Sequence, residues 1–180
     1  MSTGLLEKSA IDTYFVKRDI VQIGAVVLNN PKYAHNVGQA LRACVDYAAP
    51  ELWCSGQRIL DAVTLLDRIP REERMRNYRD VALVTDMDPM KKLPSHAVPV
   101  IVELVPGAEN LFEFQHPENA VYIFGPEDGS VEPRWRSLGH RYVKIDTMHC
   151  LNLATAIGTV LYDRDQKNHL EKMGVLKWDR

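Results

Sequence analysis

Short runs of apolar residues alternate along the chain with longer stretches in which apolar residues recur at helical spacing. Several of the short runs are rich in valine and isoleucine and are apolar at consecutive positions, which is typical of parallel strands buried on both faces. The predicted strands are 21–30, 51–56, 81–86, 98–105, 120–125 and 142–146. The pattern predicts an α/β fold, with a mostly parallel sheet covered by helices on both faces.

Two segments carry the i, i+3, i+4, i+7 repeat of an amphipathic helix. One runs from Val37 to Ala48 and the other from Leu153 to Leu161. The arginine-rich segment 68–80 is predicted to be a loop. The whole chain, 1–180, is predicted to be one domain. Residues 1–20 would be an N-terminal extension, and residues 165–180 would continue the second helix into a charged tail.

Composition narrows the classes of protein that this chain can belong to. It has 180 residues, of which 46% are hydrophobic, and this is enough for one buried core. Its net charge is -2, so bulk charge does not make it a general polyanion binder, and any nucleic-acid contact must come from a local patch. No secretory leader or membrane span is visible. We expect a soluble, cytoplasmic protein with no membrane partner.

The three cysteines, Cys44, Cys54 and Cys150, show no CxxC spacing. An odd number of cysteines without a ligand cluster around them favours reduced thiols over a disulfide framework or a zinc site. We expect no metal.

The stretch "HNVGQALRAC", residues 35–44, begins the first predicted helix. Asn36 and Gln39 have the spacing of a helix N-cap and its N3 partner, so capping alone explains both. Gly38 costs about 1 kcal/mol relative to alanine inside a helix, which suggests that a ligand or another chain approaches closely. Arg42 lies on the same face as Gly38. It is either a solvated surface residue or a residue that faces this approach.

A second stretch, "VYIFGPEDGSV" at 121–131, runs from a strand into a glycine-rich loop. Ligands of open α/β sheets bind beyond the carboxyl ends of strands, so this loop is a candidate site, although a tight turn with solvated acids explains it equally well. The chain has no GxGxxG after the first strand and no P-loop. In a third stretch, 149–164, Asn152 is predicted to cap the second helix. The three stretches could converge on one pocket.

These three motifs, in this order, resemble those of the SpoU-type (TrmH-like) branch of the SPOUT RNA methyltransferases. The motifs are "HNVGQALRAC", "FGPEDGSV" and "CLNLATAIGTVLYD", and the resemblance covers residues 23–164. It implies a C-terminal trefoil knot, bound S-adenosylmethionine and a homodimer with a shared active site. Members of the family mostly methylate a ribose 2′-hydroxyl of tRNA or rRNA. Since no separate RNA-binding domain is visible, tRNA is slightly favoured.

The resemblance also assigns residues, position by position. Asn36, Arg42, Glu127 and Asn152 match the family's catalytic or site-organising positions. The cofactor-binding candidates are Thr85, Gly125, Ile145, Cys150, Leu151 and Leu153.

The sequence departs from the family pattern in the third motif. Cys150 and Ala154 stand where the family usually has serines, and Asp146 replaces a usual proline. The family proposal makes the arginine at position 42 the base that takes the hydroxyl proton. A guanidinium is normally protonated, so our own hypothesis is that Arg42 orients the 2′-oxygen and stabilises the developing alkoxide. Both alternatives stay open at this point.

Two basic stretches are candidates for phosphate contacts. Residues 68–79 hold five arginines and two glutamates, and residues 132–144 hold four basic residues and one glutamate. The RNA-binding candidates are Arg71, Arg74, Arg76 and Arg134. Charge runs are more often solvated faces than binding sites. Tyr33 and Trp53 could stack on bases, although packing in the core is the commoner role for such residues.

Two rival hypotheses remain. One is a non-catalytic RNA-binding or assembly protein on the same fold, suggested by the missing serines. The other is methylation of a base rather than of a ribose.

Overall fold

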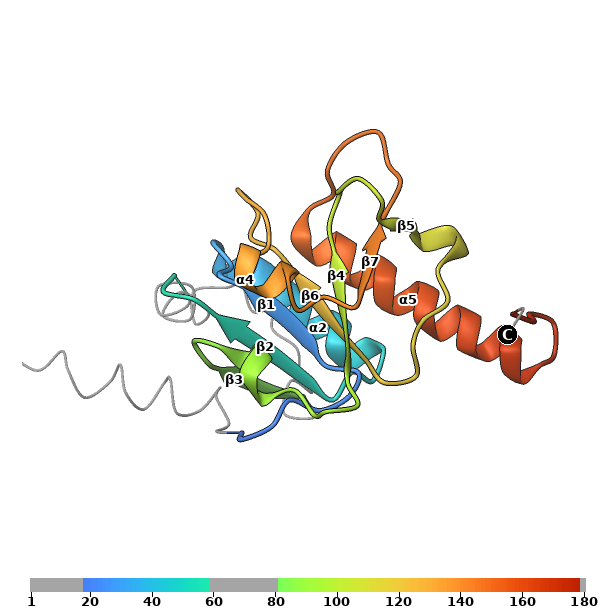
Figure 1. The fold of residues 1–180 in the computed structure, drawn as a ribbon, viewed down its shortest axis with the longest axis horizontal. Coiled ribbons are helices and arrows are strands. Elements are labelled where there is room, and N and C mark those ends of the chain that lie inside the picture. Colours follow the sequence, from blue (N-terminus) through green and yellow to red (C-terminus); the bar gives the residue numbers. More distant parts are fainter. Residues whose placement is uncertain (1–17, 59–80, 179–180) are drawn as a thin grey trace, which may run out of the picture.

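The computed structural model describes residues 18–58 and 81–178, which form one parallel sheet with helices packed on it (Figure 1). The strand order is β3-β2-β1-β6-β4-β7-β5, and every neighbouring pair is parallel. The strands are β1 Val26–Asn29, β2 Glu51–Ser55, β3 Ala82–Thr85, β4 Val98–Val102, β5 Glu109–Asn110, β6 Ala120–Phe124 and β7 Arg141–Lys144. The helices are α2 Ala34–Asp46, η3 Pro89–Lys92, η4 Leu111–Glu113, α4 Pro133–Arg136 and α5 Leu153–Lys172.

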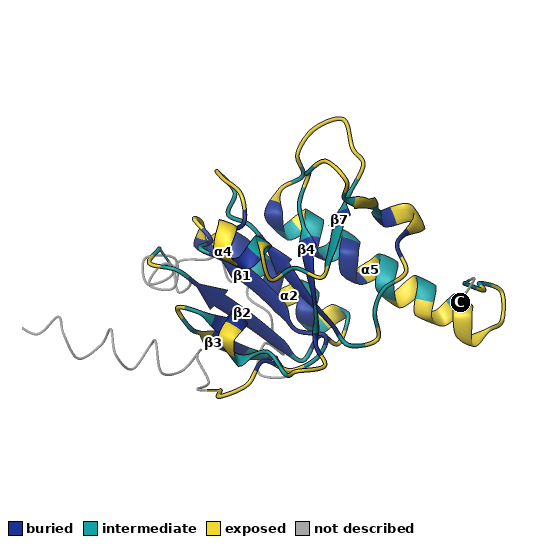
Figure 2. Ribbon diagram, in the orientation of Figure 1, coloured by how far each residue is buried: buried dark blue, intermediate teal, exposed yellow. Residues whose placement is uncertain are grey.

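Both faces of the sheet are buried, which explains the consecutive apolar positions in the sequence. In β6, Tyr122 and Phe124 pack into the cluster that contains α2 and α5, whereas Val121 and Ile123 pack into the cluster of the opposite face, with Trp135 of α4. The central strands β1, β2 and β6 are therefore buried along their whole length and are dark when coloured by burial (Figure 2). A strand covered on both sides cannot show polar alternation.

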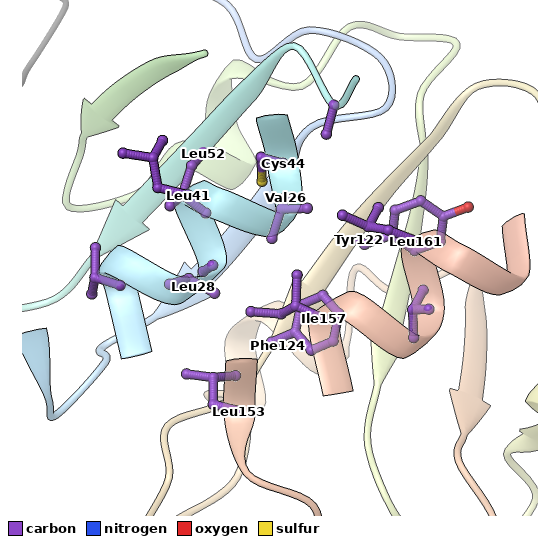
Figure 3. Packing of buried hydrophobic residues seen from close by; sticks show 14 of the residues in the cluster. Val26, Leu28, Leu41, Cys44, Leu52, Tyr122, Phe124, Leu153, Ile157 and Leu161 are labelled. Carbon is purple, nitrogen blue, oxygen red and sulfur yellow. The ribbon is translucent and has the colours of Figure 1, made fainter. Parts of the chain in front are cut away.

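The long helices α2 and α5 lie on the same face of the sheet and pack against each other. Figure 3 shows Leu41 and Cys44 of α2 and Ile157 and Leu161 of α5 pointing into the layer above the strands. The last turns of α5 extend past the sheet and are mostly exposed (Figure 2). The opposite face is covered by η3, α4 and the segment that precedes β1.

The predicted α/β class, six of the strands and both long helices are confirmed. The two-residue β5 and the short helices η3, η4 and α4 were not predicted from the sequence, because elements of two to four residues are too short to show a periodicity. The predicted loop at 68–80 lies outside the described residues.

The two long helices begin in different ways. Asn152 caps α5 as predicted, since its Oδ1 accepts from the amides of Ala154 at 2.9 Å and Thr155 at 3.4 Å. The predicted cap of the first helix is wrong. α2 begins at Ala34 with Tyr33 as its N-cap residue, so Asn36 lies inside the first turn with its side chain free to bond elsewhere.

In the described part of the chain, no helix is both long enough and apolar enough to cross a membrane.

A buried polar cluster fastens α5 to the sheet. The ring of His116 is 2% exposed, and its Nε2 lies 2.8 Å from Asp163 Oδ2 of α5. Its Nδ1 lies 2.8 Å from the hydroxyl of Tyr122 on β6. Lys167 pairs with Asp163 at 2.7 Å. Burial lowers the pKa of His116 despite the neighbouring carboxylate, and Arg164 and Lys167 add to this effect.

This cluster predicts a pH-dependent stability. Because the folded pKa of His116 lies below the unfolded value of about 6.5, the unfolded chain binds the proton more readily. The stabilisation is therefore complete above about pH 6.5 and is lost as the pH falls through the folded pKa. We expect the free energy of unfolding to decrease between pH 7.5 and 5.5 in the wild type, and to decrease less in His116→Gln. Denaturant titrations at several pH values measure this. The control His140→Gln removes an exposed imidazole, and equal pH slopes for all three proteins would contradict the prediction.

Candidate active site

A cavity of about 560 Å³ opens at the carboxyl ends of the central strands. Its wall comes from four segments: the start of α2, the end of β4, the glycine loop after β6, and the segment between β7 and α5. These segments are far apart in sequence, but parallel strands bring their carboxyl ends to one edge of the sheet. Such an edge is where open α/β sheets bind ligands.

The amide of Asn36 joins the three sequence motifs at the rim of this cavity. Its Nδ2 donates to Glu127 Oε1 at 2.7 Å, and its Oδ1 accepts from Asn152 Nδ2 at 2.9 Å. Asn36 is only 3% exposed, whereas its partner Glu127 is half-buried and Asn152 is exposed, so the amide lies at the boundary between the core and the solvent. An amide suits this place because it donates on one side and accepts on the other.

Glu127 also supplies the cap that α2 lacks locally. Its carboxylate accepts from the backbone amides of Lys32 at 2.7 Å and Tyr33 at 3.3 Å. These amides lie just before the helix, where a negative charge is favoured by the helix dipole. A residue of the glycine loop therefore fixes where the first motif sits.

The side chain of the next residue, Asp128, also binds the segment before α2. It accepts two hydrogen bonds from Arg58, at 2.9 and 3.0 Å, and pairs with the Lys32 ammonium at 3.2 Å. The bonds from Arg58 and Lys32 lower the pKa of Asp128. Two adjacent carboxylates of the glycine loop thus hold the segment that leads into α2.

Gly125 is required by a close approach within the loop itself. A Cβ at this position would lie 2.9 Å from the backbone nitrogen of Val131 and 3.2 Å from the carbonyl carbon of Ser130. A Cβ contact below 3.0 Å is essentially absent from folded proteins, so the loop can fold back over Gly125 in this way only because the side chain is missing.

Glu103, directly after β4, brings a further carboxylate to the cavity wall. Its Oε1 accepts from the Val131 amide at 3.2 Å. Its Oε2 is shielded from solvent and has no hydrogen-bond partner among the described residues.

The structure brings three of the four predicted catalytic residues together and leaves out the fourth. Asn36, Glu127 and Asn152 line the cavity, whereas Arg42 is exposed and does not. Within residues 18–58 and 81–178, no hydrogen bond or ion pair holds its guanidinium. Arg42 is six residues after Asn36, which places it about 9 Å further along the helix and about 120° around it. Arg42 therefore points away from the cavity of its own chain.

Of the six predicted cofactor residues, five line the cavity and one does not. The five are Gly125, Ile145, Cys150, Leu151 and Leu153. Thr85 is a correction. It ends β3, which lies at the edge of the sheet, with β2 and β1 between it and β6. The sequence shows which segments are strands but not their spatial order, so it does not indicate which strand ends meet at the cavity. The end of β4 takes its place.

The RNA-binding candidates have different outcomes. Arg71, Arg74 and Arg76 lie outside the described residues. Arg134 is on α4, where its guanidinium contacts Glu132 at 2.6 Å and Asp88 at 3.4 Å, so it is already paired with two carboxylates. Trp53 is fully buried, so packing in the core, the commoner role for such a residue, is confirmed for it and stacking on a base is excluded.

Tyr33 and Glu103 also line the cavity. Glu103 was not predicted as a site residue, and the role of Tyr33 was left open. Tyr33 is 52% exposed although it lines the cavity, and the Lys32 ammonium lies 5.2 Å from the centre of its ring. The sequence does contain an indication that Glu103 is a site residue, because it is a single acid that interrupts the apolar run 98–105 near the end of a strand.

The fold and the cavity define a parallel α/β protein with a small-molecule site at the carboxyl ends of its strands. The sequence matches the model of the SpoU rRNA methylase family over residues 24–162. The chain belongs to this family of RNA methyltransferases, and the expected SpoU-type identity is confirmed.

Solved structures of related proteins share the fold. The SpoU methyltransferase AviRb from Streptomyces viridochromogenes, in complex with AdoMet, is 18% identical with a TM-score of 0.62; the match covers 88% of this chain and 62% of that one. The TrmH/SpoU tRNA modifying enzyme of A. aeolicus is 19% identical with a TM-score of 0.70, over 95% of this chain and 87% of that one.

A third structure, described for the 2-OH methylation of C/U34 on tRNA, is 20% identical with a TM-score of 0.65 over 88% of this chain and 97% of that one. This chain thus spans less than two thirds of AviRb but most of the other two proteins. No curated protein sequence matches it.

The cavity residues fit S-adenosylmethionine, the expected cofactor. A volume of about 560 Å³ is within the range of about 300–1,000 Å³ that small-molecule sites occupy. The wall combines apolar side chains such as Phe124 and Leu151 with a carboxylate, Glu103, that has an unused acceptor oxygen. Among the described residues, no group of three or more metal-ligating side chains is present.

The Asn36 network predicts the effect of one substitution. Asn36→Asp replaces the donor that lies 2.7 Å from Glu127 with a carboxylate oxygen, and two ionised carboxylates at that distance repel each other. We expect a loss of about 2–4 kcal/mol in the free energy of unfolding at pH 7.5, and a smaller loss at pH 5.5, where the pair can share a proton. Denaturant unfolding measures both values.

Asn168→Asp is the matched control, because it adds the same charge at an exposed position of α5. If Asn36→Asp were as stable as this control at both pH values, the network would not be formed in solution.

Proposed function

We propose that the chain transfers a methyl group from S-adenosylmethionine to a ribose 2′-hydroxyl of RNA, with tRNA slightly favoured over rRNA. The observation that supports this most strongly is the junction of the three family motifs through Asn36, Glu127 and Asn152 at the rim of the cavity. The family match makes methylation the first reaction to test. We further propose a cytoplasmic location and a trefoil knot in the C-terminal part of the chain.

The bound cofactor supplies an electrophilic methyl group on its sulfonium. The chain must then hold the 2′-oxygen in line with that methyl group and tolerate the charge that develops as the hydroxyl proton leaves. An arginine suits this task, because its planar fork can bind the oxygen and a neighbouring phosphate together. We assign this orienting role to Arg42.

Arg42 faces away from the cavity of its own chain, so this assignment requires a second copy. We propose a homodimer in which the Arg42 of one protomer reaches the cavity of its partner. The exposed position of Arg42 and its lack of any partner in the described part of the chain support this proposal. Asn36 and Glu127 then shape the cavity, and Asn152 fixes the start of α5.

Tyr33 offers a surface for the RNA. It stands at the mouth of the cavity with half of its area exposed, beside the positive charge of Lys32. Aromatic rings in such places stack on unpaired bases, and a nearby lysine can contact phosphate. We propose that the base of the target nucleotide stacks on Tyr33.

The function is tested with methyl-labelled S-adenosylmethionine and total RNA from cells that lack this protein, followed by digestion with a ribonuclease that cleaves through the 2′-hydroxyl. We expect label in RNA, in a dinucleotide that resists cleavage, because a 2′-O-methyl group blocks the hydrolysis. Label in single nucleotides would indicate base methylation. Binding of RNA without any label would favour the rival assignment, a non-catalytic RNA-binding or assembly protein.

Arg42→Lys and Arg42→Ala test the orienting role. We expect alanine to lower the turnover about 10²- to 10³-fold, the usual effect of removing a group that stabilises a developing oxyanion. Lysine should recover only a small part, because it lacks the fork. Stability and affinity for S-adenosylhomocysteine should stay at wild-type values, as they should in the control Lys172→Ala. Wild-type turnover in Arg42→Lys would refute the requirement for fork geometry.

The shared site predicts complementation. Gly125→Ala should displace the glycine loop and so inactivate the cavity of its own chain. Mixing it with Arg42→Ala should restore methylation, because mixed dimers contain one intact site. If a mixture of the two variants stays inactive after the dimers have been dissociated and reassembled together, the shared site is contradicted.

Tyr33→Ala tests the RNA surface. We expect about a 10- to 100-fold loss of RNA affinity, since stacking contributes about 1–3 kcal/mol for each base. Tyr33→Phe should bind RNA as well as the wild type, and S-adenosylhomocysteine should bind all three equally. Phe112→Ala is the control, because Phe112 is 86% exposed and does not line the cavity. RNA affinity that is unchanged in Tyr33→Ala would remove Tyr33 from the substrate surface.

A further inference from the structure

Glu103 is held firmly at the cavity wall by its backbone. Its amide donates to the carbonyl of Val143 on β7 at 3.0 Å, and its own carbonyl accepts from the amide of Val105 at 3.0 Å. The side chain therefore leaves the sheet at a fixed place, immediately after β4.

Only one of the two carboxylate oxygens of Glu103 has a hydrogen-bond donor among the described residues. Oε1 accepts from the Val131 amide at 3.2 Å and so helps to fold the glycine loop back over Gly125. Oε2 is shielded from solvent and has no partner among the described residues. Buried carboxylate oxygens are almost always hydrogen-bonded, so an unpaired one on a residue that lines a cavity points to a donor from outside the described residues.

The other acid in the wall, Glu127, already has three hydrogen-bond donors. Glu127 accepts from two backbone amides and from Asn36, so it has little capacity left for a ligand. Among the described residues that line the cavity, these two are the only carboxylates. Of the carboxylate oxygens on these lining residues, Oε2 of Glu103 is therefore the one that is buried and has no described donor.

We propose that Glu103 binds the methyl donor directly, by accepting through Oε2 a hydrogen bond from a hydroxyl or ammonium group of S-adenosylmethionine. This role rests on the proposed function. Glu103 is then a cofactor-binding residue that also holds the glycine loop, and the loop and the cofactor are linked through one carboxylate.

Glu103→Gln tests this role, because glutamine keeps the shape of the side chain and the acceptor for Val131 but replaces the other oxygen with a donor. We expect S-adenosylhomocysteine, measured by calorimetry, to bind about 10- to 100-fold more weakly, as is usual when a charge-assisted bond is lost. The cofactor-free variant should unfold at the wild-type temperature. Glu113→Gln makes the same charge change at an exposed position outside the cavity and should bind normally.

A second ligand identifies the donor group. Methylthioadenosine keeps the ribose but lacks the amino-acid part. An equal loss of affinity for both ligands in Glu103→Gln would place the partner on the nucleoside, and a loss for S-adenosylhomocysteine alone would place it on the ammonium group. Wild-type affinity of Glu103→Gln for both ligands would overturn the proposal.

The controls separate this proposal from the proposed function. If the wild type binds S-adenosylhomocysteine and Glu103→Gln binds it equally well, only the role of Glu103 fails. If the wild type binds neither ligand, the proposed function fails as well. Should the variant not fold, crystals of the wild type with S-adenosylhomocysteine answer the same question. A ligand nitrogen or oxygen within about 3.2 Å of Oε2 would support the proposal, and a larger separation would overturn it.

Discussion

The arrangement of the site depends on one buried amide, that of Asn36. It bonds Glu127 of the glycine loop on one side and Asn152 at the start of α5 on the other. These residues are 91 and 116 positions away from it along the chain. Other bonds tie the glycine loop to the segment before α2, but among the hydrogen bonds described above only the Asn36 amide reaches both that loop and the start of α5. Through this amide, the first turn of α2, the glycine loop and the start of α5 form one wall of the cavity.

The parallel sheet makes this link possible. Because every strand runs in the same direction, the segments that follow β1, β4, β6 and β7 all emerge at one edge. The sheet is packed on both faces and so provides a fixed base from which these segments emerge. The polar groups are concentrated in those loops, where Glu127 and Asp128 fasten the segment before α2.

The sequence predicted those features that depend on local rules. Consecutive apolar residues such as Val121 to Phe124 predicted buried parallel strands, and Asn152 was recognised as a cap because its partners are two and three residues away. The cap at Asn36 was predicted wrongly, because its place is taken by a carboxylate from a distant loop. Thr85 was misplaced because strand order is a property of the whole fold. The resemblance to a family brought Asn36, Glu127 and Asn152 together before their contacts were known. It could not show that Arg42 points away from the cavity of its own chain.

Hydrogen exchange with and without S-adenosylhomocysteine tests the central claim, that the linked loops form the cofactor site. The account predicts that added ligand slows exchange mainly in residues 124–131 and 145–153 and at the amides of Lys32 and Tyr33, which Glu127 holds. Protection confined to other segments, under conditions in which the ligand is shown to bind, would contradict it.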